Sequence, residues 1–149
     1  MAKAYASAII RAPVGAVWRV VRDFNALPAW FPIIVASEIE DGRAGDSVGC
    51  VRSFRTGDGL HVRERLLALD DVEHRVTYNF EKPAFPVENY RATFRLLPVT
   101  ADGSTFAEWE ATFDEAPEDA GKYVAVISNE IFAEGLKALN ATLMNVQRR

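Results

Sequence analysis

The hydrophobic period of the chain changes once, near Pro117, and this change limits the folds that the chain can adopt. Between residues 33 and 114, apolar and polar side chains alternate in six successive segments, which is the pattern of half-buried β-strands. After Pro117, apolar residues recur every three or four positions, as in an amphipathic helix. Because successive strands with short turns pair antiparallel, we expect an antiparallel sheet that buries its apolar face against this helix.

Turn residues such as Asp41-Gly42 and Gly57-Asp58-Gly59 separate the expected elements. We predict strands at residues 3–11, 33–40, 47–55, 60–69, 75–82, 88–98 and 104–114. Two short helical segments should follow the first strand, one ending near Asp23 and a second helix or turn within residues 25–32. The long helix should begin near Pro117 and carry an apolar stripe of Val124, Ile127, Ile131, Leu139, Leu143 and Val146.

The composition is that of a globular protein, with 149 residues of which 49% are hydrophobic and 26% charged. No repeat or linker divides the chain, so we expect a single domain over residues 1–149. The net charge of −4 and the scattered basic residues argue against nucleic acid as a partner. We also expect no membrane span and a cytoplasmic location, because apolar runs are short and the N-terminus lacks signal-peptide features.

Few residues are available for metal or cofactor chemistry. The sequence contains one cysteine, Cys50, and two histidines, His61 and His74, which leaves no set with the spacing of a metal site. The glycines do not form a phosphate-binding loop between a strand and a helix. We therefore expect neither a metal nor a cofactor.

The predicted inward faces carry a few polar side chains among apolar ones. Arg52 and Glu64 have inward parity on successive strands and opposite charge. Since an unpaired buried charge is strongly unfavourable, one explanation is a structural ion pair across the two strands. The other is a cavity between sheet and helix, filled by water or ligand, in which these side chains and Tyr90 are the polar groups.

The segment Ile10 to Pro32, with Pro13, Trp18 and a second cluster around Trp30, resembles the start of a Bet v 1-like/START domain of the polyketide cyclase/dehydrase group. The resemblance covers essentially the whole chain. It implies an α+β helix-grip fold, a seven-stranded antiparallel sheet curved around a long C-terminal helix. In this fold two short helices follow the first strand, and a hydrophobic cavity lies between sheet and helix.

Three segments also resemble the plant lachrymatory-factor synthase branch of this superfamily. They are Cys50-Val51-Arg52, residues 63–70 around Glu64 and residues 89–99 around Tyr90. The branch uses an arginine, a glutamate and a tyrosine to rearrange a small sulfenic acid, so the resemblance implies catalytic roles for Arg52, Glu64 and Tyr90. The segment between Arg52 and Glu64 is shorter here, so the pocket mouth can differ.

Our first hypothesis is a carrier or sensor that binds a small hydrophobic molecule bearing an oxygen near Arg52. The alternative is a cofactor-free cyclase, dehydrase or isomerase, with Glu64 as acid/base and Arg52 and Tyr90 as orienting groups. A protein-interaction module is a third hypothesis, although the scattered arginines form no patch. A homodimer suits a chain of this size, but no interface can be named.

The sequence does not distinguish ligand-binding residues from core residues on the inward faces. The expected ligand-binding residues are Trp30, Phe31, Tyr78, Phe80, Phe94, Trp109 and Phe113.

Overall fold

The computed structural model describes residues 1–147, which contain one seven-stranded antiparallel sheet in the order β1-β7-β6-β5-β4-β3-β2. Strands β2 to β7 form a meander, and β1 pairs with β7 at the far edge. The sheet and the long helix confirm the predicted helix-grip fold. The strands are β1 (Ala2–Ile10), β2 (Ile34–Ile39), β3 (Val51–Thr56), β4 (His61–Asp70), β5 (Arg75–Lys82), β6 (Val87–Val99) and β7 (Ser104–Glu115).

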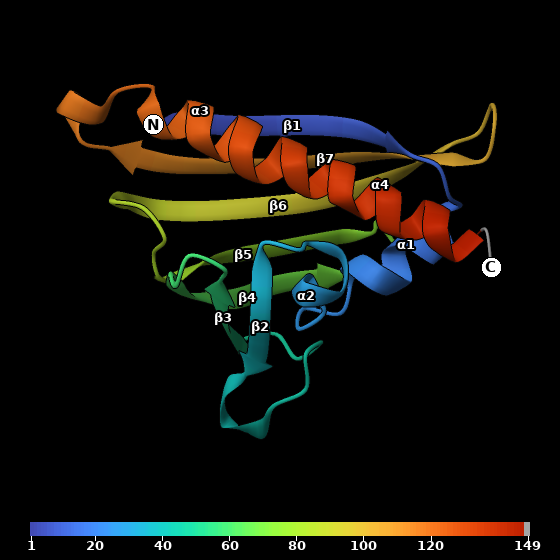
Figure 1. The fold of residues 1–149 in the computed structure, drawn as a ribbon, viewed down its shortest axis with the longest axis horizontal. Coiled ribbons are helices and arrows are strands. Elements are labelled where there is room, and N and C mark those ends of the chain that lie inside the picture. Colours follow the sequence, from blue (N-terminus) through green and yellow to red (C-terminus); the bar gives the residue numbers. More distant parts are fainter. Residues whose placement is uncertain (148–149) are drawn as a thin grey trace.

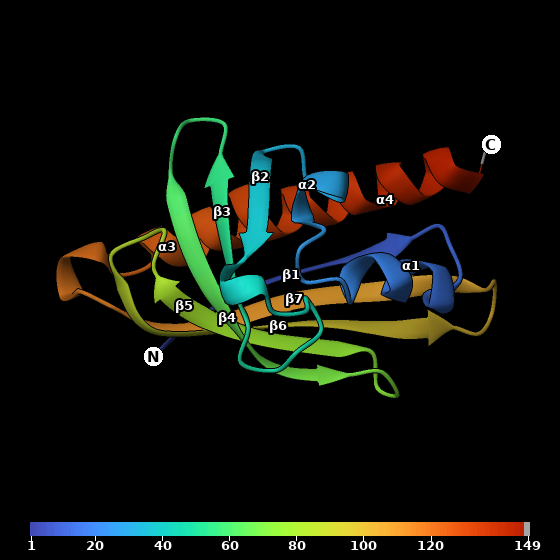
Figure 2. The ribbon, with the colours of Figure 1, turned by 90° about the horizontal axis from the view of Figure 1, so that it is seen from below.

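The C-terminal helix crosses one face of the sheet, and the short helices α1 (Val14–Val21) and α2 (Leu27–Trp30) lie near its C-terminal half (Figures 1 and 2). A short 3₁₀ turn, η1 (Glu40–Gly42), follows β2. Helix side chains also hydrogen-bond edge strand β1 and the residue after it. The Tyr5 amide donates to Ser128 Oγ at 3.0 Å, and the Arg11 amide donates to Asn140 Oδ1 at 2.8 Å.

The long helix begins later than Pro117, where we had predicted its start. A 3₁₀ turn, η2 (Pro117–Asp119), comes first, and Gly121 then adopts a left-handed conformation with φ +84°. The Glu115 carboxylate accepts hydrogen bonds from the amides of Gly121 and Tyr123, which caps the new start. The helix consists of α3 (Lys122–Ala125), the π-helical segment η3 (Val126–Ala133) and α4 (Glu134–Gln147).

The π-helical segment changes which helix residues are buried. The buried hydrophobic side chains of the described helix are Ile127, Phe132, Leu136, Leu139 and Leu143, so one step of five residues interrupts the three- and four-residue spacing. The prediction was wrong for Val146, which is 61% exposed, and it did not include Phe132 and Leu136. The predicted Ile131 is partly buried against the core. A π turn contains an extra residue, and that residue rotates the following side chains on the helix surface.

Strand alternation is confirmed for most inward positions and fails at three places. Leu60, the first inward position of the predicted strand 60–69, precedes β4 and is 39% exposed. In β7, the inward residues Thr105, Ala107, Trp109, Ala111 and Phe113 are all buried. Strand β3 begins at Val51 rather than 47, because Gly49 turns with φ +94° and leaves Val48 exposed. In β4, a bulge between Leu66 and Ala68 reverses the parity, so Ala68 is exposed instead of buried.

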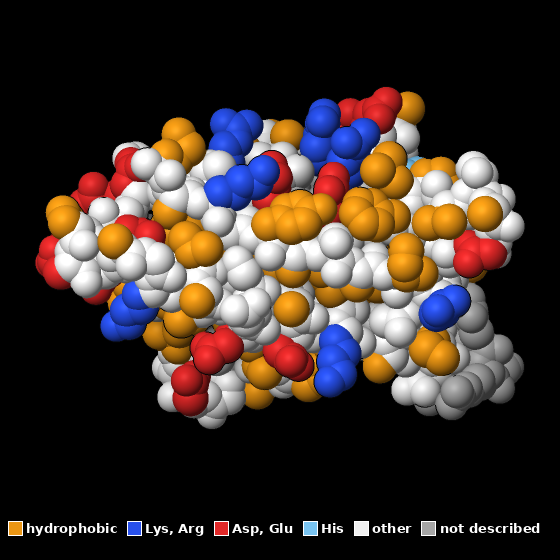
Figure 3. Space-filling view, turned by 90° about the horizontal axis from the view of Figure 1, so that it is seen from above, with side chains coloured by type: hydrophobic (Ala, Val, Ile, Leu, Met, Phe, Trp, Pro, Cys, Tyr) orange, Lys and Arg blue, Asp and Glu red, His pale blue; other side chains and the backbone are white. Residues whose placement is uncertain are grey.

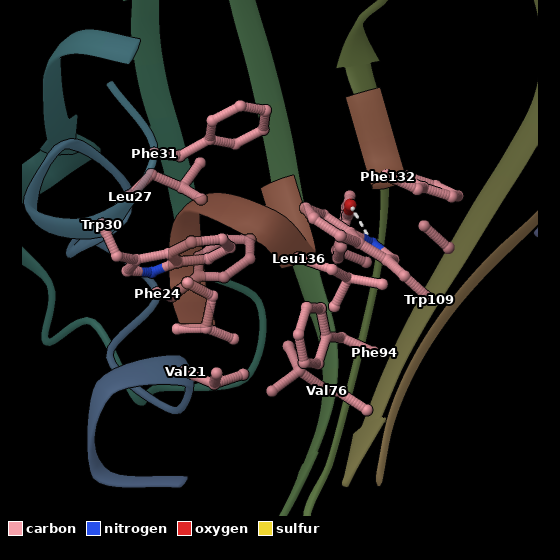
Figure 4. Packing of buried hydrophobic residues seen from close by; sticks show 14 of the residues in the cluster. Val21, Phe24, Leu27, Trp30, Phe31, Val76, Phe94, Trp109, Phe132 and Leu136 are labelled. Atoms are coloured by element: carbon pink, nitrogen blue, oxygen red, sulfur yellow. Dashed lines mark hydrogen bonds between the residues drawn. The ribbon is translucent and has the colours of Figure 1, made fainter. Parts of the chain in front are cut away.

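Aromatic side chains from the sheet and α2 meet beneath the helix (Figure 4). The Trp109 ring stacks on Phe132 with centroids 4.6 Å apart and lies 6.0 Å from the Trp30 ring. Gly135 of α4 passes directly over this cluster. A Cβ at this position would lie 2.8 Å from Trp109 Cζ3 and 3.0 Å from Phe31 Cε2, so the packing requires a glycine.

We predict that Gly135→Ala destabilises the protein by about 1–3 kcal/mol, although alanine favours helices, because the surrounding rings hold Trp109 in place. The matched control is Gly15→Ala in α1, where a new Cβ meets nothing within 4 Å. Helix propensity should make that variant equal to or up to about 1 kcal/mol more stable than the wild type. Urea unfolding of the three proteins measures both values, and equal stability of Gly135→Ala and the wild type would contradict the close contact.

Candidate functional site

Arg52 of β3 and Glu64 of β4 are direct neighbours across the two strands. The short connection through residues 57–60 sets this register, and both side chains have inward parity. The two residues are only 6% and 4% exposed. The sequence prediction that they share a buried face is therefore confirmed, and the fold brings opposite charges together inside the protein.

The contacts of the guanidinium are specific. Arg52 Nε donates to Glu64 Oε1 at 2.8 Å, and Nη2 lies 2.7 Å from the same oxygen. Nη1 donates to the Phe24 carbonyl at 3.1 Å, and the Phe24 ring lies 3.9 Å from the guanidinium carbon. Tyr78 provides a second aromatic face at 4.9 Å. A charge-assisted hydrogen bond and cation–π contacts thus replace the water that Arg52 loses on burial.

Burial raises the pKa of the Glu64 carboxyl above its ordinary value of 4.5, and the Arg52 guanidinium only partly opposes this shift. The folded protein therefore holds the Glu64 proton more tightly than the unfolded chain does. The contribution of this shift to stability is complete below pH 4.5 and is lost as the pH rises through the folded-state pKa.

The pair forms part of the wall of a pocket between the sheet and the C-terminal helix. The cavity measures about 80 Å³. Most of its wall is apolar, and the polar groups gather where β3, β4, β5 and β6 approach one another. The lining comprises Leu27, Phe31, Ile33, Ile34, Arg52, Phe54, Thr56, Leu60, Val62, Glu64, Tyr78, Phe80, Ala84, Phe85, Tyr90, Trp109, Ile127, Ile131 and Phe132.

Seven of the ten residues selected from the sequence line this pocket, namely Arg52, Glu64, Tyr90, Phe31, Tyr78, Phe80 and Trp109. The other three lie elsewhere. Trp30 and Phe94 border an adjoining hollow of about 20 Å³ that shares Arg52, Tyr78 and Trp109 with the pocket. Phe113 lies behind Tyr90 with ring centroids 6.0 Å apart. Catalytic and ligand-binding roles for all ten residues stay predictions.

Two tyrosine hydroxyls and an indole add polar groups to the same wall. The Trp109 Nε1–H donates to the Tyr78 hydroxyl oxygen at 3.0 Å (dashed in Figure 4). The Tyr90 ring stacks on Phe80 with centroids 3.9 Å apart. Burial, together with the nearby Glu64 carboxylate, raises the pKa of Tyr78 and of Tyr90, so both hydroxyls keep their protons at neutral pH.

Sequence reasoning missed several lining residues. Phe132 faces the pocket because of the π-helical segment, which hydrophobic periodicity does not reveal. Phe85 comes from a connecting segment, where alternation gives no direction. Ile33 and Leu60 lie at the ends of the predicted strands 33–40 and 60–69; Leu60 was predicted to face inward, but neither was selected as a ligand-binding residue. Both Ile33 and Leu60 are hydrophobic but partly exposed, at 43% and 39%, and they lie at the mouth of the pocket. A proline on each side of Ala84-Phe85 was the one available sequence signal for a fixed loop there.

A second pair, Ser53 and His61 on the outer side of the β3–β4 hairpin, has the composition of a nucleophile and its base. His61 Nε2 lies 2.7 Å from Ser53 Oγ. However, Lys82 Nζ lies 3.3 Å from His61 Nδ1 and can only donate to it. Nε2 of the neutral ring then carries the proton and donates to Ser53, so it cannot accept the serine proton as a general base would.

The outer face of the sheet holds a wider polar hollow of about 380 Å³, lined by Ala68, Arg75, Thr77, Arg91, Thr93, Arg95, Glu108 and Glu110. Acidic and basic side chains are mixed there, and they are also mixed over the surface seen in Figure 3. Within residues 1–147, no group of three or more His, Cys, Asp or Glu side chains could hold a metal ion. In the same residues, no helix is both long and apolar enough to cross a membrane.

Residues 1–144 match the model of a family described as polyketide cyclase/dehydrase and lipid transport. Over 98 residues, the chain is 33% identical to the abscisic acid receptor PYL7 of Arabidopsis thaliana. This match covers 63% of the chain and 44% of the receptor, so the chain spans less than half the length of that relative.

Solved bacterial structures resemble the chain over nearly its full length. XoxI from Bacillus cereus is 31% identical, with a TM-score of 0.86 and 99% of each chain covered. A protein from Nitrosospira multiformis is 30% identical, with a TM-score of 0.84, covering 99% of this chain and 100% of that one. A protein from Thermobifida fusca is 34% identical, with a TM-score of 0.85 and coverages of 94% and 91%.

We predict that Arg52→Met lowers the free energy of unfolding by about 3–5 kcal/mol, because Glu64 is left as an unpaired buried charge. The double variant Arg52→Met/Glu64→Leu should recover most of this loss, since it removes both charges. As a control, Lys3→Met breaks an exposed pair with Glu110, in which the side chains are 59% and 42% exposed, and should cost less than about 1 kcal/mol. Urea unfolding distinguishes these cases, and a double variant as unstable as Arg52→Met would contradict the explanation.

Proposed function

The chain belongs to the polyketide cyclase/dehydrase and lipid transport family, and we propose that it binds a small hydrophobic molecule in the pocket between the sheet and the C-terminal helix. The observation that carries the proposal is a buried polar cluster in an otherwise apolar pocket wall. Ligand pockets typically combine apolar walls with a few convergent polar groups that fix orientation. The name of the receptor relative, which identifies a small organic ligand, also supports this class of function.

The volume limits the ligand. An apolar cavity of about 150 Å³ holds benzene, whereas this pocket measures about 80 Å³. The enclosed space therefore fits a molecule of a few heavy atoms, or the polar end of a larger molecule whose remainder lies in the mouth. The exposed apolar side chains of Ile33 and Leu60 would contact such a remainder.

We predict that binding is lost when the pocket is filled from the helix side. Ile131 lines the pocket and is half-buried, so Ile131→Trp should weaken binding of small phenols and cyclic alcohols by about tenfold or more. Val146→Trp is the control, because Val146 lies on the same helix, does not line the pocket and is 61% exposed. Backbone NMR shifts map the site and give affinities. Equal affinity in both variants, or shifts confined to the outer sheet face, would refute the proposal.

The raised pKa of Glu64 favours a second candidate function, cofactor-free acid/base catalysis of the cyclase, dehydrase or isomerase type. In this candidate, Glu64 exchanges a proton with the bound molecule, while Arg52 holds the carboxylate in place and Tyr90 donates a hydrogen bond to a developing oxyanion. The same pocket serves both functions, so binding alone does not distinguish them.

For any bound compound that the protein converts, Glu64→Gln should lower kcat by about 10²-fold or more, because the amide cannot transfer the proton. Affinity for an uncharged compound without a hydrogen-bond donor should change little, since glutamine keeps the shape of the side chain. Steady-state rates and binding by NMR, measured on the same preparations, separate the two effects. Wild-type turnover by Glu64→Gln would exclude the acid/base role.

A further inference from the structure

All three guanidinium nitrogens of Arg52 already have oxygen partners. Nε and Nη2 contact Glu64 Oε1, and Nη1 donates to the Phe24 carbonyl. The Phe24 and Tyr78 rings lie 3.9 Å and 4.9 Å from the guanidinium carbon. These contacts use three of the five N–H groups of Arg52. A second N–H on Nη1 and on Nη2 can still donate to a ligand, whereas a ligand oxygen could take the place of Glu64 Oε1 only by displacing it.

The charge of the site opposes such a displacement when the ligand is an anion. Arg52 and Glu64 cancel one another, so the buried wall has no net positive charge. A carboxylate that took Oε1's place would leave the Glu64 carboxylate unpaired, buried and next to a second negative charge. Both consequences are strongly unfavourable away from water.

The hydrogen-bonding groups that remain available at the pocket wall match a hydroxyl group on a ligand. The closest Arg52 contacts end on Oε1, which leaves Glu64 Oε2 as an acceptor at the pocket wall. The Tyr78 oxygen accepts from Trp109 and is hydrogen-bonded to the Tyr90 hydroxyl. One tyrosine proton is used within this pair, and the other can be donated to a ligand. A hydroxyl donates one hydrogen bond and accepts others, so it matches both kinds of group.

We infer that the pocket selects uncharged ligands that carry a hydrogen-bond donor, such as a phenol, enol or alcohol, and rejects carboxylates. The inference rests on the proposed function, because it specifies the ligand class of the same pocket. It assigns ligand contact to Glu64 Oε2 and the tyrosine hydroxyls, and it makes Arg52 the group that neutralises and holds Glu64.

Three probes of similar ring size test the selection near neutral pH: phenol, fluorobenzene without a donor, and benzoate as the anion. In each, the substituent would enter the enclosed space and the ring would lie toward the mouth. Phenol should bind at least about tenfold more tightly than fluorobenzene, the difference expected for one hydrogen bond to a charged group. Benzoate should cause no shift of pocket residues such as Phe31, Trp109 or Ile131 in backbone NMR spectra. This ranking in the wild-type protein decides the inference without any variant.

Glu64→Gln provides the reciprocal test. It leaves Arg52 as an uncompensated cation, and because Arg52 takes the one amide oxygen, an NH₂ donor replaces the Oε2 acceptor. Benzoate binding should then increase at least about tenfold, and phenol should lose most of its advantage over fluorobenzene. Glu108→Gln, on the outer sheet face, changes the net charge equally and should keep the wild-type ranking. If the wild type binds benzoate or fluorobenzene as tightly as phenol, the inference is wrong but the proposed function still stands. No pocket response to any probe overturns it together with the proposed function.

Discussion

The buried ion pair between Arg52 and Glu64 is the interaction on which the rest of the site depends. A charge in an apolar interior is tolerated only when a partner and hydrogen bonds replace the lost water. Here Glu64 lies directly opposite Arg52 on the neighbouring strand, and the Phe24 carbonyl accepts a further hydrogen bond from Arg52. The pair is not needed for a stable core, since apolar residues of similar volume can do as well or better. Its place in a pocket wall therefore suggests a role toward a bound molecule.

The fold explains why such a pair can exist beside an open pocket. Strands β3 and β4 fix the two charges by their register, while the segment between α1 and α2 supplies Phe24 from outside the sheet. The helix covers the sheet tightly at Gly135, where aromatic rings fill the space, and less tightly toward η3, where the pocket lies. Gly135 therefore allows close packing at one part of the helix, and the π-helical segment η3 lies over the pocket at another.

The sequence predicted the fold and the inward face of most strands, because alternation is strong in β5, β6 and β7. It also placed Arg52 and Glu64 on one face, which their register confirms. It missed the reversal at Ala68, since a bulge leaves no trace in hydrophobic alternation. Pocket wall and core could not be distinguished, because both have the same parity. Trp109 lines the pocket and Phe113 does not, although they lie on the same strand face.

The central claim is that the Glu64 carboxylate is buried, faces the pocket and accepts a hydrogen bond from a bound hydroxyl. NMR titration of the Glu64 carboxyl carbon, with and without saturating phenol, tests it directly. We expect the free protein to give a midpoint above the ordinary value of 4.5. Phenol should lower this midpoint, because hydrogen-bond donation stabilises the charged carboxylate. A midpoint at or below 4.5 that phenol leaves unchanged would contradict the claim.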